Sequence, residues 1–174
     1  MEMQYIVRGA ELSDLRKIMI LYRTVAALSG GIARQADEIT KTYVRNFIER
    51  SLETGIILTI EDPANPDALI AEVHTCTPGI RVFAHILSDL TIVVHPDYQD
   101  KGIGTLLFGT LMEKIEVEYP GIVRVELIAR ESNEKAIEFY KKFGFRVEGR
   151  LEKRIFGKTG MLEADIPMGW VRLR

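Results

Sequence analysis

Apolar side chains recur at helical spacing near the start of the chain. Residues 12–28 carry them every three or four positions, at Leu15, Ile18, Met19, Tyr22, Val25 and Ala26. This stripe predicts an amphipathic helix, which Ser13 or a neighbour is expected to cap and Ser29-Gly30-Gly31 to end. A second stripe with the same spacing predicts a helix over residues 36–53.

Short β-rich runs separated by turn residues predict the strands. They cover residues 4–9, 56–77, 85–96, 123–129, 146–156 and 161–172, and residues 63–67 make the second run a hairpin. The near-continuous apolar content of residues 123–129 predicts burial on both faces of that strand. Further helices are expected directly after the glycine turn at residues 99–104 and over residues 133–143. This order predicts one α/β (α+β) domain over residues 1–174, built on a mixed sheet.

The charges are nearly balanced, because 23 Lys and Arg stand against 25 Asp and Glu, for a formal net charge of -2. Such a balance gives no strong field for nucleic acid or an anionic membrane, and basic clusters such as Lys141-Lys142 are short. Cys76 is the single cysteine and there are three histidines, so we expect neither an intramolecular disulfide nor a metal site. With no signal peptide and no apolar run of ~18 residues, we expect a cytoplasmic protein without a membrane segment.

The segment from Val94 to Thr105 is the most informative part of the sequence. A strand ends there, two glycines follow, and a long helix begins at once. The first N–H groups of a helix can bind phosphate oxygens, Gly102 and Gly104 leave room for a diphosphate, and Lys101 can add positive charge. Neither common nucleotide motif fits, since Gly104 is followed by Thr105-Leu106 and then Leu107 where a dinucleotide motif needs glycine. A glycine pair that only turns the chain is the alternative.

Two motifs in order carry a family resemblance. V-x-P followed by Q-x-x-G-x-G covers Val94–Gly104, and N-x-x-A-x-x-F-Y-x-x-x-G-F covers Asn133–Phe145. Separated by one helix and one strand, they resemble the acetyl-coenzyme A (acetyl-CoA) signature of the GNAT superfamily of N-acetyltransferases, closely over residues 85–150. The resemblance implies the GNAT fold, a central mixed, mostly antiparallel, twisted sheet of six to seven strands flanked by about four helices.

The resemblance also implies roles for particular residues. The diphosphate cradle would be formed, mostly by backbone amides, from Gln99, Asp100, Lys101, Gly102, Ile103, Gly104 and Thr105. Ile92 and Val94 would lie on the strand whose backbone pairs with the pantetheine arm. Asn133 would contact that arm, although it could simply cap a helix. Tyr140 would protonate the departing thiolate, although it could simply be a core aromatic side chain.

The implied reaction is direct attack of a primary amine on acetyl-CoA in a ternary complex, the amine belonging to a small molecule, an amino acid or a peptide. The general base stays open among Glu72, His74, His85, Asp89, Glu126 and a chain of waters. His95 is expected to support the turn and Cys76 to be a small core residue rather than a nucleophile.

The acceptor pocket is expected between residues 29–36 and residues 156–161, since these segments flank the acceptor in proteins of this fold. Asp165 could attract a cationic amine there or pair within the last hairpin. Two other readings remain: a module that binds acyl-CoA without catalysis, and an unrelated α/β nucleotide-binding protein. A homodimer is common in the fold, but no apolar segment of the sequence requires one.

Overall fold

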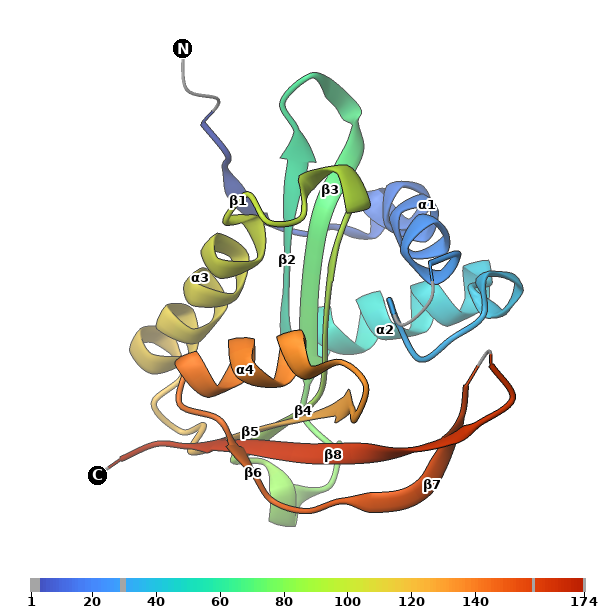
Figure 1. The fold of residues 1–174 in the computed structure, drawn as a ribbon. Coiled ribbons are helices and arrows are strands. Elements are labelled where there is room, and N and C mark those ends of the chain that lie inside the picture. The colour runs from blue at the N-terminus through green and yellow to red at the C-terminus, as the bar shows by residue number, and fades with distance from the viewer. Residues whose placement is uncertain (1–3, 29–30, 158, 174) are drawn as a thin grey trace.

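In the computed structural model, which describes residues 4–28, 31–157 and 159–173, one twisted sheet runs through the molecule (Figure 1). Its strands are β1 (Val7–Gly9), β2 (Gly55–Asp62), β3 (Asn65–Cys76), β4 (Ile86–Val94), β5 (Arg124–Arg130), β6 (Arg146–Val147), β7 (Leu151–Phe156) and β8 (Leu162–Val171). Their order is β1-β2-β3-β4-β5-β8-β6, with β7 also paired to β8. The pair β4 and β5 is parallel, and the other pairs are antiparallel.

Helices cover both faces of the sheet (Figure 1). They are α1 (Leu15–Ala26), α2 (Lys41–Thr54), α3 (Ile103–Glu118) and α4 (Glu134–Lys142). The apolar sides of α1 and α2 pack with Ile57, Leu69 and Val93 of the sheet into one core. A larger core on the opposite face joins α3 and Tyr140 of α4 to side chains of β2, β3, β4, β5 and β8.

These observations confirm the predicted fold class, with two corrections. The sheet in the described part of the chain has eight strands rather than six or seven, because residues 146–156 form two strands, β6 and β7, instead of one. The prediction that residues 123–129 are buried on both faces is wrong. Alternate residues of β5 are buried, and Ile128 is 53% exposed on the face away from α4.

The start of α1 also differs from the expectation. A 3-10 turn over Leu12–Asp14 precedes the helix, and the carboxylate of Asp14 accepts the N–H of Glu11 at 2.9 Å, so Ser13 is not the cap. The guanidinium of Arg8 binds the same carboxylate at 2.8 Å and holds its pKa below the usual value. Of the residues predicted to end this helix, Ser29 and Gly30 lie outside the described residues.

The sheet divides between β4 and β5. These strands pair only at Ile86 with Arg124 and Leu87 with Val125, and then separate. Beyond this point β4 stays paired with β3, through a bulge at which Asp89 adopts a φ of 52°. A bulge bends a strand and increases its twist, so it contributes to the divergence. The result is a wedge-shaped gap between the second half of β4 and the second half of β5.

Candidate functional site

The backbone of β4 faces this gap at two alternate residues. The N–H of His95 donates to the C=O of Ile70 on β3 at 2.7 Å. Along an antiparallel strand the N–H and C=O groups point to either neighbour in alternation, so those of Ile92 and Val94 point away from β3, toward β5. Both side chains pack on the core beneath α3. Their backbone groups are therefore placed to bond an extended chain that carries amides.

The first turn of α3 closes one end of the gap. Gly102 stands just before the helix with a φ of 78°, a conformation that favours glycine. The N–H groups of the first turn lack partners within the helix and carry its positive dipole end. A Cβ on Gly104 would come within 3.7 Å of Cγ2 of Val94, so this turn directly adjoins the end of β4. This arrangement suits a ligand in which a diphosphate, bound at the helix start, is joined to an extended chain that lies along β4.

Side chains around this turn hold it in shape. Nε2 of Gln99 donates to the C=O of Val94 at 3.2 Å, and the carboxylate of Asp100 pairs with the ammonium of Lys135 on α4. Nδ1 of His95 accepts the N–H of Asp97 at 3.2 Å, which confirms that His95 supports the turn. The ammonium of Lys101 lies 5.2 Å from the centre of the Tyr98 ring.

On α4, Asn133 and Tyr140 both have structural partners. Oδ1 of Asn133 accepts the N–H of Ala136 at 3.1 Å and so caps the helix. The ring of Tyr140 packs against Phe108 and Phe139, and its side chain is 9% exposed. Burial raises the pKa of Tyr140 to about 12, so the hydroxyl stays protonated at neutral pH and can act as a proton donor.

A buried polar cluster lies on the other face of the sheet, beneath α1 and α2. It consists of Tyr22, Glu72 and His74, and we refer to it as the Tyr22 cluster. The hydroxyl of Tyr22 donates to Glu72 at 2.5 Å and lies 3.2 Å from Nδ1 of His74, which is 3.0 Å from Glu72. Burial, together with the Glu72 carboxylate, raises the pKa of Tyr22 well above its ordinary value, so Tyr22 remains a donor. The ring of Phe47 stacks on His74 with centres 4.1 Å apart.

The cluster adjoins a cavity of about 200 Å³. Its lining residues are Tyr22, Ile32, Ala33, Arg34, Tyr43 and Thr91. Thr91 lies on β4, so the cavity reaches the strand that borders the gap. Of the two segments predicted to flank the acceptor, the first contributes Ile32, Ala33 and Arg34 to the lining of this cavity, whereas Phe156 and Met161 do not line it and are largely exposed.

Arg130 connects the end of β5 to the segment that lines this cavity. It is the last residue of β5, and its guanidinium lies 3.5 Å from the carboxylate of Glu163 and 3.5 Å from the C=O of Ile32. Its Nε is buried without a hydrogen-bond partner in the described part of the chain. Arg130 thus links β5 and β8 to the segment that lines the cavity.

Among the five side chains predicted as candidate bases, the structure brings together Glu72 and His74. His85 is exposed, Asp89 pairs with Arg50 at 3.2 Å, and Glu126 pairs with Arg124 at 2.6 Å. The sequence did not single out Tyr22 for chemistry, because an apolar stripe along a helix accounts for its position equally well. A signal was available in Glu72 and His74, two polar residues on one face of a strand that is otherwise buried.

The remaining residues singled out in the sequence pack or form pairs within the protein. Asp165 is partly buried on β8, 3.7 Å from the guanidinium of Arg154, and burial raises the pKa of its carboxyl. Met168 lies in the core. Cys76 is buried, and burial raises the pKa of its thiol, which disfavours the nucleophilic thiolate.

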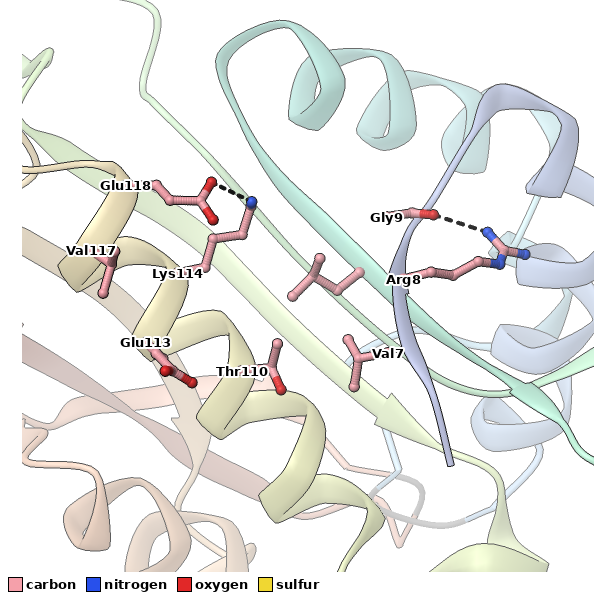
Figure 2. A pocket seen from close by; sticks show the side chains of 9 residues that line it. Val7, Arg8, Gly9, Thr110, Glu113, Lys114, Val117 and Glu118 are labelled. Carbon is pink, nitrogen blue, oxygen red and sulfur yellow. Dashed lines mark hydrogen bonds and ion pairs between the residues drawn. The ribbon is translucent and has the colours of Figure 1, made fainter. Parts of the chain in front are cut away.

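A larger cavity, of about 340 Å³, lies between β1 and α3, and Figure 2 shows its lining. Three of the charged groups there already have partners, since Arg8 binds Asp14 and Lys114 pairs with Glu118. None of the candidate catalytic or cofactor-binding residues predicted from the sequence lines this cavity. Within residues 4–28, 31–157 and 159–173, no group of three or more side chains could hold a metal ion, and no helix is long and apolar enough to cross a membrane.

Comparison with known proteins agrees with this geometry. A family model described as "Acetyltransferase (GNAT) domain" matches residues 56–147. Spermidine N(1)-acetyltransferase of Escherichia coli K12 is 34% identical over 76 residues, which are 41% of this chain but only 38% of that relative. The chain therefore matches well under half the length of this curated relative.

Solved structures of the same fold cover nearly the whole chain. A GNAT-family acetyltransferase from Streptococcus pneumoniae superposes with a TM-score of 0.83 at 21% identity, over 97% of this chain and 100% of that one. The yncA protein of Salmonella typhimurium, described as a putative acetyltransferase with its cofactor acetyl-CoA, has a TM-score of 0.75 at 17% identity. That likeness covers 99% of this chain and 96% of yncA. At these identities the similarity establishes the fold.

The Tyr22 cluster yields a stability prediction. Tyr22→Phe removes a donor from the fully buried Glu72 carboxylate, which should lower the free energy of unfolding by about 2 kcal/mol. Urea unfolding would measure the difference. Tyr119→Phe is the matched control, since the hydroxyl of Tyr119 bonds no group in the described ranges, and it should change stability by less than about 0.5 kcal/mol. Equal losses in both variants would contradict the role of this bond.

Proposed function

The chain belongs to the GNAT acetyltransferase family, whose members use acetyl-CoA, and we propose that it transfers the acetyl group to a primary amine by direct attack in a ternary complex. One observation carries the proposal. The gap beside β4 runs between a first helical turn suited to a diphosphate and a cavity lined by Tyr22 of the Tyr22 cluster. A thioester held along β4 and an amine held in the cavity could thus meet at one strand, which brings the reacting groups together.

The residues of the gap fit acetyl-CoA, which supplies an activated thioester carbonyl when bound. We assign the pantetheine arm to the backbone of Ile92 and Val94 and the diphosphate to the segment Gln99–Thr105, with Lys101 adding charge. Asn133 uses Oδ1 to cap α4, which leaves its amide nitrogen available to the arm. The cavity would admit an amine of a small molecule or amino acid, or the end of a peptide.

We assign the proton transfers to two sites. Tyr140 is the acid that protonates the departing sulfur, since its hydroxyl carries its proton at neutral pH. The Glu72–His74 pair is the base, and the proton of the attacking amine reaches it through Tyr22, whose hydroxyl takes that proton as it gives its own to Glu72. Both side chains are nearly inaccessible to solvent, yet their partner Tyr22 lines the cavity. The curated relative is named for acetylation of spermidine, an amine, which supports this class of acceptor.

Thermal unfolding with acetyl-CoA tests cofactor binding. Acetyl-CoA at ~100 times its Kd should stabilise the wild-type fold by about 2.7 kcal/mol, seen as a higher melting temperature. Gly104→Trp should abolish this shift, because the new side chain would fill the space beside Val94. Gly121→Trp, whose Cβ would meet nothing within 4 Å, should keep it. If Gly104→Trp kept the full shift, the assigned cradle would be wrong.

Tyr140→Phe tests the acid. The ring and its packing remain while the proton donor is lost, so turnover should fall about 10² to 10⁴-fold with little change in the KM for acetyl-CoA. The rate of thiol release at saturating acceptor would measure this. A variant as fast as the wild type would show that another group protonates the sulfur.

His74→Gln tests the base against its matched control, His85→Gln. The first variant should lower turnover about 10²-fold or more and keep the acetyl-CoA melting shift, because β4 and α3 are untouched. The exposed His85 should be replaceable without loss. Unchanged turnover in His74→Gln would instead favour deprotonation through water.

A further inference from the structure

Arg34 is the charged residue among those that line the acceptor cavity. Its guanidinium carbon lies 3.8 Å from the centre of the Tyr43 ring, in a cation–π contact. A guanidinium held by an aromatic face can still direct N–H groups at a planar anion, because its donors lie along its edges. Arg34 is therefore fixed at the cavity wall by the ring and the hydroxyl of Tyr43, which leaves most of its five guanidinium donors available.

Other arginines of the same region are committed to partners. Arg23 donates to the C=O of Ile39, Arg45 pairs with Glu49, and Arg130 lies against Glu163 and Ile32. No carboxylate in the described part of the chain comes within 4.0 Å of Arg34. The positive charge at the cavity wall thus has no counter-charge from the described residues.

A second lining residue, Tyr22, belongs to a cluster that carries a carboxylate. Its hydroxyl bonds the carboxylate of Glu72 and the ring of His74. Tyr43 connects the two regions, since its ring contacts both Arg34 and Phe47, and Phe47 stacks on His74. A molecule in the cavity therefore meets both the Tyr22 hydroxyl, which bonds the buried Glu72 carboxylate, and the guanidinium of Arg34. The volume of about 200 Å³ lies below the range typical of drug-sized ligands, which favours a small acceptor.

We propose that the acceptor is a small amine that also carries a carboxylate, as an amino acid does, and that Arg34 binds this carboxylate while the amine faces the Tyr22 cluster. This inference rests on the N-acetyltransferase function proposed above. A polyamine would instead place a second positive charge near Arg34, at a cost in electrostatic energy. The acceptor class differs in this respect from the spermidine for which the curated relative is named.

A panel of matched acceptors tests the proposal. The purified chain with acetyl-CoA is offered the standard L-amino acids, their carboxamides, their decarboxylated amines and spermidine, and released thiol is followed. At least one amino acid should be acetylated with a kcat/KM ~10-fold or more above that of its carboxamide, which keeps the shape and loses the charge. Arg34→Gln should raise the KM for that amino acid at least ~10-fold and leave the KM for its carboxamide nearly unchanged.

Two further variants serve as controls. Arg34→Lys keeps the charge without the planar donors and should recover part of the lost affinity. Arg45→Gln removes a guanidinium from α2 outside the cavity lining and should behave as the wild type. Each variant should melt within a few degrees of the wild type, because Arg34 is exposed.

The outcomes separate this inference from the function on which it rests. Acetylation of spermidine or decarboxylated amines in preference to amino acids would overturn the carboxylate subsite and leave the N-acetyltransferase function standing. If nothing in the panel is acetylated, melting scans with coenzyme A and each amino acid decide. A stabilisation lost in Arg34→Gln supports the subsite, and its absence for every amino acid overturns it. A protein that acetyl-CoA does not stabilise would refute the proposed function itself.

Discussion

The whole site depends on the backbone hydrogen bonds of β4. A buried strand must find partners for its N–H and C=O groups, and β4 finds them on β3 but, beyond Leu87, not on β5. Two cores lie on opposite faces of the sheet, with α3 and α4 on one face and α1 and α2 on the other. The gap therefore behaves as a missing strand. A ligand with amides along its length can fill the gap. The first turn of α3 can then bind one end of that ligand, and the other end can reach the cavity.

Burial of the Glu72 carboxylate in the Tyr22 cluster costs free energy that other interactions must offset. A carboxylate with no exposed surface is unfavourable unless it is hydrogen-bonded, and Glu72 gains this from Tyr22 and His74. Phe47 stacks on the imidazole and keeps its ring in place. Because α1 supplies Tyr22, α2 supplies Phe47 and β3 supplies the other two, the cluster forms only when these elements have packed. Its chemistry depends on long-range folding rather than on any local segment.

The parts of the fold and site that the sequence predicted are those that local patterns encode. The glycine turn before α3, the support from His95 and the ends of α4 at Asn133 and Gly144 follow from short motifs. Pairing across the sheet is not encoded locally, so the split of residues 146–156 and the one-sided burial of β5 were not predicted. The role of Tyr22 was not predicted for the same reason, since its hydrogen-bond partners lie 50 and 52 residues away in the sequence. Candidate bases could be named, but only tertiary structure could choose among them.

The pairing at Ile86 and Leu87 also determines how the width of the gap responds to small rotations of the strands. Two strands joined at one end form a lever with a short fixed arm, so a small rotation there becomes a larger change in width at the far end. The guanidinium of Arg130, at the far end of β5, lies 3.5 Å from the C=O of Ile32, which is a long contact that constrains this end only weakly. The width of the gap is therefore most sensitive to rotation where the proposed cofactor arm would lie, and least sensitive where the two strands are joined.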